Sequence, residues 1–182
     1  MKKLKILGLD PSMSNLGIAW ATYSPDSQSL LVDRVETVSP KPETSKQIRQ
    51  NSKDLDRAKQ LYAALEAAVA SSDLVCVEIP VGSQSARAMA SYGICVGLLA
   101  SIKKPMIQVT PAEVKAVTGI RNASKTEVID WVLATHPYLL LATHNGKLSL
   151  AKAEHQADAV AAIHAAMNTD RFKALCLIGN QP

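Results

Sequence analysis

The chain has 182 residues, of which 47% are hydrophobic, and a formal net charge of +4 with a pI near 9.0. This length suits one domain over residues 1–182, and the hydrophobic content argues against disorder. No apolar run is long enough to span a bilayer, and the basic charge mildly favours a polyanionic partner such as nucleic acid. The three cysteines are widely spaced and odd in number, so we expect a reducing, cytoplasmic location. They form no Cys-x-x-Cys pair, so we expect no zinc site.

Residues 4–10 predict a buried first strand that ends in an acid. Pro11 cannot donate to a sheet ladder, so we expect the strand to stop at Asp10. A turn at residues 15–17 and a second strand over 18–23 complete a hairpin. An ionised carboxylate at the end of a buried strand is costly unless a metal ion or a lysine lies beside it. The alternative is that Asp10 only caps the turn, as Asp often does before Pro.

The next elements predict a second acid beside the first. A third strand over 30–38, a helix over 46–70 and a buried strand over 74–80 follow in order. A right-handed strand–helix–strand connection places this last strand parallel to a neighbour. If that neighbour is the first strand, Asp10 and Glu78 end the same edge, where they repel each other unless a cation lies between them. Mg²⁺ and Mn²⁺ prefer such oxygen ligands; the alternative is that Glu78 is an ordinary surface acid.

A polar loop and a helix rich in small residues come after Glu78. The helix is expected over residues 85–101, and a fifth strand over 106–109 follows it. Gly93 and Gly97 lie four residues apart on one side of this helix, which indicates close contact with another helix or with the sheet.

Three basic residues flank a turn between two further helices. The first helix is expected over residues 111–119, and the capping box at 124–127 starts the second. Lys115, Arg121 and Lys125 lie around the turn, next to the free N–H groups of a helix start. This predicts a phosphate-contacting surface, although any one of these side chains could be an ordinary solvated cation.

Residues 136–150 predict a loop or a short apolar flap. His136 and His144 show no metal-ligand spacing, so we interpret both as surface residues.

The last informative segment is an alanine-rich helix over residues 153–166. Glu154, His155 and Asp158 lie three and four residues apart, so they project toward one sector of the helix. Acids near a helix start can simply complement its dipole, but Asp158 lies deeper and needs a partner. His164 lies well beyond them and is interpreted as a packed or exposed residue.

Taken in order, these elements resemble the RuvC family of Holliday junction resolvases, in the ribonuclease H-like superfamily. The resemblance runs from Ile6 to about Met167. Its motifs are Gly8-Leu9-Asp10-Pro11-Ser12 with Gly17, Val77-Glu78, Val114 to Gly119, Lys125, and His155-Gln156-Ala157-Asp158-Ala159. It implies an α/β fold: a five-stranded mixed sheet, made of an antiparallel three-strand meander plus two parallel strands, with helices on both faces.

The resemblance also implies a function, namely cleavage of four-way DNA junctions by two-metal-ion phosphodiester hydrolysis. The enzyme would be a homodimer that acts on branched DNA in recombination or repair. No association with a membrane is expected. The implied catalytic residues and ligands of two Mg²⁺ or Mn²⁺ ions are Asp10, Glu78, Asp158 and His155. The expected DNA contacts are Lys115, Arg121, Lys125, Ser83, Gln84 and Arg87.

The chain departs from the family pattern in the loop after the second acid. The family usually has an aromatic or bulky wedge there, whereas residues 79–85 contain no aromatic residue. This pattern also fits a structure-selective nuclease with relaxed substrate choice, such as one of a phage or mobile element. The alternatives are a nuclease for RNA–DNA hybrids and a non-catalytic branched-DNA-binding module. An actin-like ATPase would need a second lobe, for which the length leaves little room.

Overall fold

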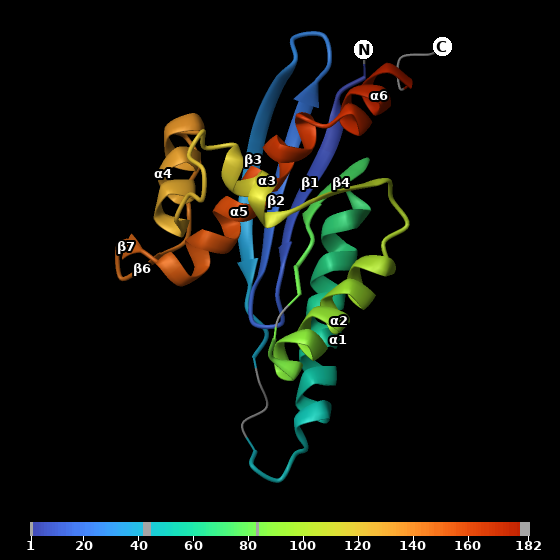
Figure 1. Ribbon diagram of the computed structural model, residues 1–182, viewed down its shortest axis with the longest axis vertical. Coiled ribbons are helices and arrows are strands. Elements are labelled where there is room, and N and C mark those ends of the chain that lie inside the picture. The colour runs from blue at the N-terminus through green and yellow to red at the C-terminus, as the bar shows by residue number, and fades with distance from the viewer. Residues whose placement is uncertain (1, 42–44, 83, 179–182) are drawn as a thin grey trace.

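A computed structural model describes residues 2–41, 45–82 and 84–178, and a five-stranded sheet forms its centre (Figure 1). The strand order is β3-β2-β1-β4-β5. These strands are β1 (Leu4–Pro11), β2 (Leu16–Ser24), β3 (Ser29–Val38), β4 (Leu74–Glu78) and β5 (Met106–Val109). The helices are α1 (Gln50–Ala70), α2 (Ala86–Ala100), α3 (Pro111–Ala116), α4 (Lys125–Thr135), α5 (Leu150–Met167) and α6 (Asp170–Ile178).

The sheet is mixed, as the sequence predicts. Strands β1, β2 and β3 form an antiparallel meander, while β4 pairs in parallel with both β1 and β5. Leu9 lies opposite Val77 in the parallel ladder between β1 and β4. The residues that follow them, Asp10 and Glu78, are therefore brought to the same edge of the sheet.

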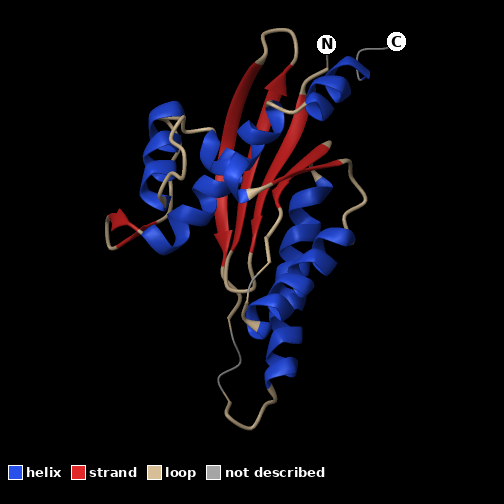
Figure 2. Ribbon diagram, in the orientation of Figure 1, coloured by secondary structure: helices blue, strands red, loops and turns tan. Residues whose placement is uncertain are grey.

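Both faces of the sheet are covered by helices (Figure 2). Alternate residues of β1 point to opposite faces, so Leu7 packs in the core beneath α1 and α2 and Ile6 packs in the core beneath α5. This double burial explains why β1 and β4 read as continuous apolar runs. Among the described residues, no helix is both long and apolar enough to cross a membrane.

Two glycines allow α5 to lie directly on the meander. A Cβ atom at Gly8 would overlap the carbonyl oxygen of Ala159, and one at Gly17 would overlap the carbonyl oxygen of His155. The backbone of α5 therefore approaches β1 and β2 more closely than any side chain would permit.

Several element boundaries differ from the predictions, and for two of them the local reason is clear. Strand β1 continues to Pro11, opposite Leu16, because a proline at a strand end removes one donor without breaking the ladder. Helix α1 begins at Gln50 rather than at residue 46, and Arg49 at its N-cap makes no side-chain cap bond. Without a Ser, Thr, Asp or Asn at that position, the sequence carries little signal for the start of this helix.

The prediction for Gly93 and Gly97 is wrong within this chain. Both glycines of α2 are exposed, and a Cβ atom at either would meet nothing within 4 Å. Buried Cys95 and Leu99 on the other side of α2 make its contact with the core instead.

The prediction for His136 is wrong as well, whereas His144 is exposed as expected. His136 is 4% exposed, and its Nε2 lies 2.9 Å from Nε2 of His164 on α5. The chain then runs through buried Leu139 and Leu141 to a small hairpin of β6 (Thr143–His144) and β7 (Lys147–Leu148). The segment after α4 is therefore an irregular loop packed against the core, followed by a short hairpin that the sequence did not predict.

Candidate active site

Asp10 and Glu78 meet at one edge of the sheet, where β1 and β4 end in parallel. Burial and the negative charges of Asp10 and Asp158 raise the pKa of Glu78 from its ordinary 4.5 to about 8, and Lys115 opposes this shift. These carboxyl groups are thus close enough to repel one another in surroundings that disfavour their charged forms.

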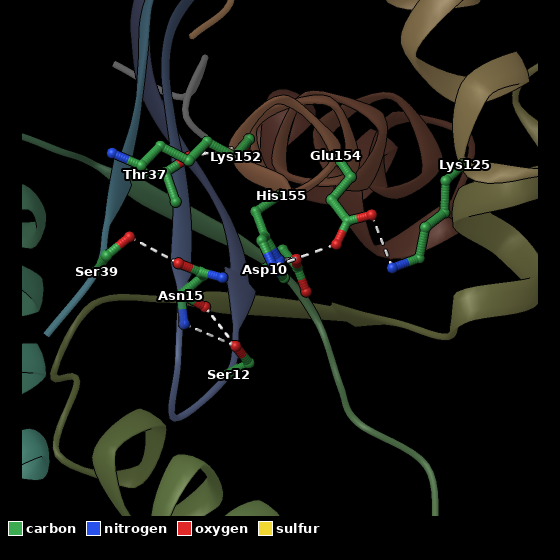
Figure 3. A network of polar contacts seen from close by, with 9 residues as sticks. All are labelled: Asp10, Ser12, Asn15, Thr37, Ser39, Lys125, Lys152, Glu154 and His155. Atoms are coloured by element: carbon green, nitrogen blue, oxygen red, sulfur yellow. Dashed lines mark hydrogen bonds and ion pairs between the residues drawn. The ribbon is translucent and has the colours of Figure 1, made fainter. Parts of the chain in front are cut away.

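Helix α5 adds an imidazole to the two acids. Gly17 lies opposite Asp10 in the β1–β2 ladder, and the backbone of His155 rests on Gly17. As a result, His155 Nδ1 lies 2.5 Å from Asp10 Oδ2 (Figure 3). The turn after β1 is closed by Ser12 and Asn15, so Asp10 is directed toward α5 and not into the turn.

Asp158 completes the acidic group one helical turn after His155. Burial and Asp10 raise the pKa of Asp158 from 3.8 to about 7, while His155 and Lys125 oppose the shift. Burial lowers the pKa of His155, but Asp10 and the neighbouring carboxylates together raise it above its ordinary value. The site therefore concentrates negative charge with one partly compensating imidazole.

A second pair of charges forms the rim of this group. Lys125 Nζ at the start of α4 lies 2.8 Å from Oε2 of Glu154, and Glu154 Oε1 lies 3.6 Å from His155 Nε2. Figure 3 shows the resulting chain of contacts from Asp10 through His155 and Glu154 to Lys125. The sequence placed Glu154 and His155 on the same helix sector, but it gave no sign that Glu154 pairs with Lys125.

The remaining predicted DNA contacts have different surroundings. Lys115 is close enough to Glu78 to influence its pKa, and Arg121 and Gln84 are exposed. Arg87 forms a bidentate ion pair with buried Asp54 of α1, at 2.5 and 2.6 Å, which occupies its guanidinium and joins α2 to α1. Ser83 lies outside the described residues.

The donor chemistry suits a hard divalent cation, because carboxylate oxygens predominate and their mutual repulsion would be relieved by positive charge. In the part of the chain that the structure describes, however, no three His, Cys, Asp or Glu side chains are spaced to hold a metal ion as they stand. Asp10 Oδ2 is engaged by His155. Metal binding would therefore require these side chains to turn toward a shared ion.

Comparison with known proteins was informative only for structure. No protein-family model matches the chain, and no curated protein matches its sequence. RuvC from T. thermophilus, in complex with a Holliday junction substrate, is similar in structure with a TM-score of 0.63 and 22% sequence identity. The match covers 91% of this chain and 97% of that one.

A viral protein gives a second match. The Fowlpox virus resolvase, in complex with Holliday junction DNA, has a TM-score of 0.51 and 15% identity. This match covers 94% of this chain and 99% of the resolvase. The fold predicted from the sequence is thus confirmed: the chain has the same mixed-sheet fold as these solved RuvC and Fowlpox virus resolvase structures.

Proposed function

We propose that this protein is a divalent-metal-dependent endonuclease that hydrolyses phosphodiester bonds in branched DNA, with four-way junctions as its main substrate. The observation that carries the proposal is the gathering of Asp10, Glu78 and Asp158 with His155 where the parallel strands β1 and β4 end. The junction-bound structures of proteins with the same fold support the choice of substrate.

The three acids and His155 would hold two Mg²⁺ or Mn²⁺ ions. Bound there, such ions supply an activated water and stabilise the leaving oxygen of the phosphodiester. The chain's own contribution is to bury the carboxylates in part and to fix them on rigid elements, two strand ends and one helix. Since burial already disfavours the charged forms of Glu78 and Asp158, cation binding is expected to release protons near neutral pH.

The DNA backbone would meet the basic residues around this edge. Lys115 lies near Glu78 and Lys125 near Glu154, so both can reach a phosphate close to the acids. Arg121 is exposed in the turn between α3 and α4 and can extend the contact.

We further propose that two copies act together, because a four-way junction has two-fold symmetry and each copy would cut one of two like strands. The outward side of α2 suits self-association: Met89 and Val96 are 46% and 47% exposed beside the open Gly93 and Gly97. Analytical ultracentrifugation should find a dimer, and Gly93→Arg should shift it toward monomer.

The test of the function is a set of labelled substrates incubated with Mg²⁺ or Mn²⁺: a four-way junction, a flap, a fork, plain duplex and an RNA–DNA hybrid. We expect paired symmetric nicks in the four-way junction, and cleavage of flaps and forks as well if selection is relaxed. Asp10→Asn should abolish cleavage while leaving folding and junction binding nearly intact. Normal cutting by this variant would refute the proposed site, and cutting of the hybrid alone would favour a ribonuclease H activity.

A further inference from the structure

The ion pair of Lys125 and Glu154 is the outermost contact of the acidic group. It joins the start of α4 to the first turns of α5, with 2.8 Å between Nζ and Oε2 (Figure 3). The Lys125 side chain is 68% exposed, whereas that of Glu154 is 20% exposed. The ammonium group thus faces solvent, and the carboxylate lies between it and His155.

This arrangement presents a conflict to an incoming phosphate. Glu154 adds a further carboxylate next to the acidic group, since its Oε1 lies 3.6 Å from Nε2 of His155, whose Nδ1 contacts Asp10. A phosphate near these acids would need a cation, but Glu154 already engages the ammonium of Lys125. DNA must therefore compete with Glu154 for the same group.

The chemistry of the pair makes an exchange of partners easy. Lysine carries a compact charge on a flexible stem, so its ammonium can change partners without a movement of the backbone. An ion pair whose lysine is largely exposed contributes little stability, because solvent screens it. Glu154 itself is held near His155 and cannot follow the lysine outward without leaving that contact.

We propose that Glu154 is a positioning residue that holds Lys125 beside the acidic site in the free protein and yields it to a DNA phosphate when substrate binds. In the free protein Glu154 thereby keeps the Lys125 ammonium close to the acids. DNA is bound more weakly than it would be without Glu154, because a phosphate must first displace the Glu154 carboxylate from Lys125. This inference rests on the proposed function, because it assumes that a phosphate of branched DNA approaches these acids.

Two simpler roles for Glu154 make different predictions. If the pair only braces α4 against α5, removing the carboxylate should lower stability and weaken DNA binding. If Glu154 only repels DNA by its charge, removing that charge should tighten binding equally with and without Lys125. An exchange of partners instead requires that the two residues be coupled.

The experiment is a double-mutant cycle on junction affinity in EDTA, where no cleavage occurs. The variants are Glu154→Gln, Lys125→Ala and their combination, and the probe is a labelled four-way junction. We expect Glu154→Gln alone to tighten binding about two- to fivefold, the range that an exposed ion pair can account for. In the Lys125→Ala background the same substitution should have no effect. The matched control is Asp130→Asn, which removes an exposed negative charge from α4, the helix that also carries Lys125. Its effect on junction affinity should be the same with and without Lys125.

Each outcome decides the matter. If Glu154→Gln tightens junction binding in the wild-type background but not in Lys125→Ala, the exchange of partners is supported. Equal tightening in both backgrounds overturns it in favour of simple repulsion, and unchanged or weaker binding by Glu154→Gln overturns it outright. The proposed function is judged separately by the wild-type protein: if it neither cuts nor prefers the junction over duplex, that function fails whatever the cycle shows.

Discussion

Replacing Glu78 by Gln should stabilise the metal-free protein while abolishing its cleavage activity. Glu78 is half-buried at the end of β4, and partial burial together with the charges of Asp10 and Asp158 raises its pKa to about 8. At pH 7 the unfolded chain carries this carboxyl ionised, because its ordinary pKa is 4.5. Folding therefore makes Glu78 take up a proton or accept unfavourable charge.

The size of the effect follows from this difference. Holding a carboxyl group protonated costs about 1.4 kcal/mol for each pH unit above its unfolded pKa, which amounts to about 3 kcal/mol at pH 7. Gln has nearly the same shape and no charge, so the free energy of unfolding should increase by about 1–3 kcal/mol. Because the folded pKa is raised, the wild-type protein loses this stability as the pH rises from about 4.5 toward 8, and the difference between the two proteins should shrink at pH 5.

The assay is urea unfolding in EDTA at pH 7 and pH 5, with Glu66→Gln on α1 as an exposed control. The control should change stability by less than about 0.5 kcal/mol. Added Mg²⁺ should stabilise the wild-type protein more than Glu78→Gln, because it binds only the folded site. If Glu78→Gln is no more stable than wild type at pH 7, burial and the neighbouring acids do not disfavour the charged form of Glu78, and the reasoning fails.

Further changes test other parts of the structure. Lys115→Ala combined with Lys125→Ala should lower the slope of log affinity against log salt by about two for junction DNA, and an unchanged slope would exclude both as phosphate contacts. Gly17→Ala places a Cβ atom against the carbonyl oxygen of His155, so it should cost more than about 2 kcal/mol of stability and reduce cleavage; a wild-type melting temperature would contradict this close approach. Burial and His136 lower the pKa of His164 to about 4, so the stability due to neutral His164 is present above pH 6.5 and is lost as the pH falls toward 4. His164→Gln, which stays neutral, should flatten the acid side of a stability–pH profile from urea unfolding, and an unaltered profile would show that the surroundings of His164 do not disfavour its protonation.

The sheet and the two strand-end acids could be predicted because the signal is local. Strands β1 and β4 are short apolar runs, and each carries an acid and a proline within a few residues of its end. The right-handed crossover then leaves few arrangements, and the parallel pairing of Leu9 with Val77 is one of them.

The errors concern side chains whose partners lie far along the chain. His136 is buried only because α4 and α5 pack together and bring His164 to it, and neither segment alone signals this. For Arg87, which stays a predicted DNA contact, the sequence gives no sign of its ion pair with Asp54 on the preceding helix. Gly93 and Gly97 match a pattern of close helix contact, yet the contact is not made within the chain. Helical spacing shows which residues share a side of a helix and not what covers that side.

Gly8 and Gly17 show how the fold and the proposed site depend on the same residues. In the sequence they read as ordinary turn and strand glycines, and only the resemblance gives them weight. In the structure each lies under the backbone of α5, and Gly17 also pairs with Asp10. Any side chain at Gly17 would lift α5 from the sheet and carry His155 and Asp158 away from the strand-end acids. A glycine opposite the first acid is therefore a physical requirement for a site built from two strand ends and one crossing helix.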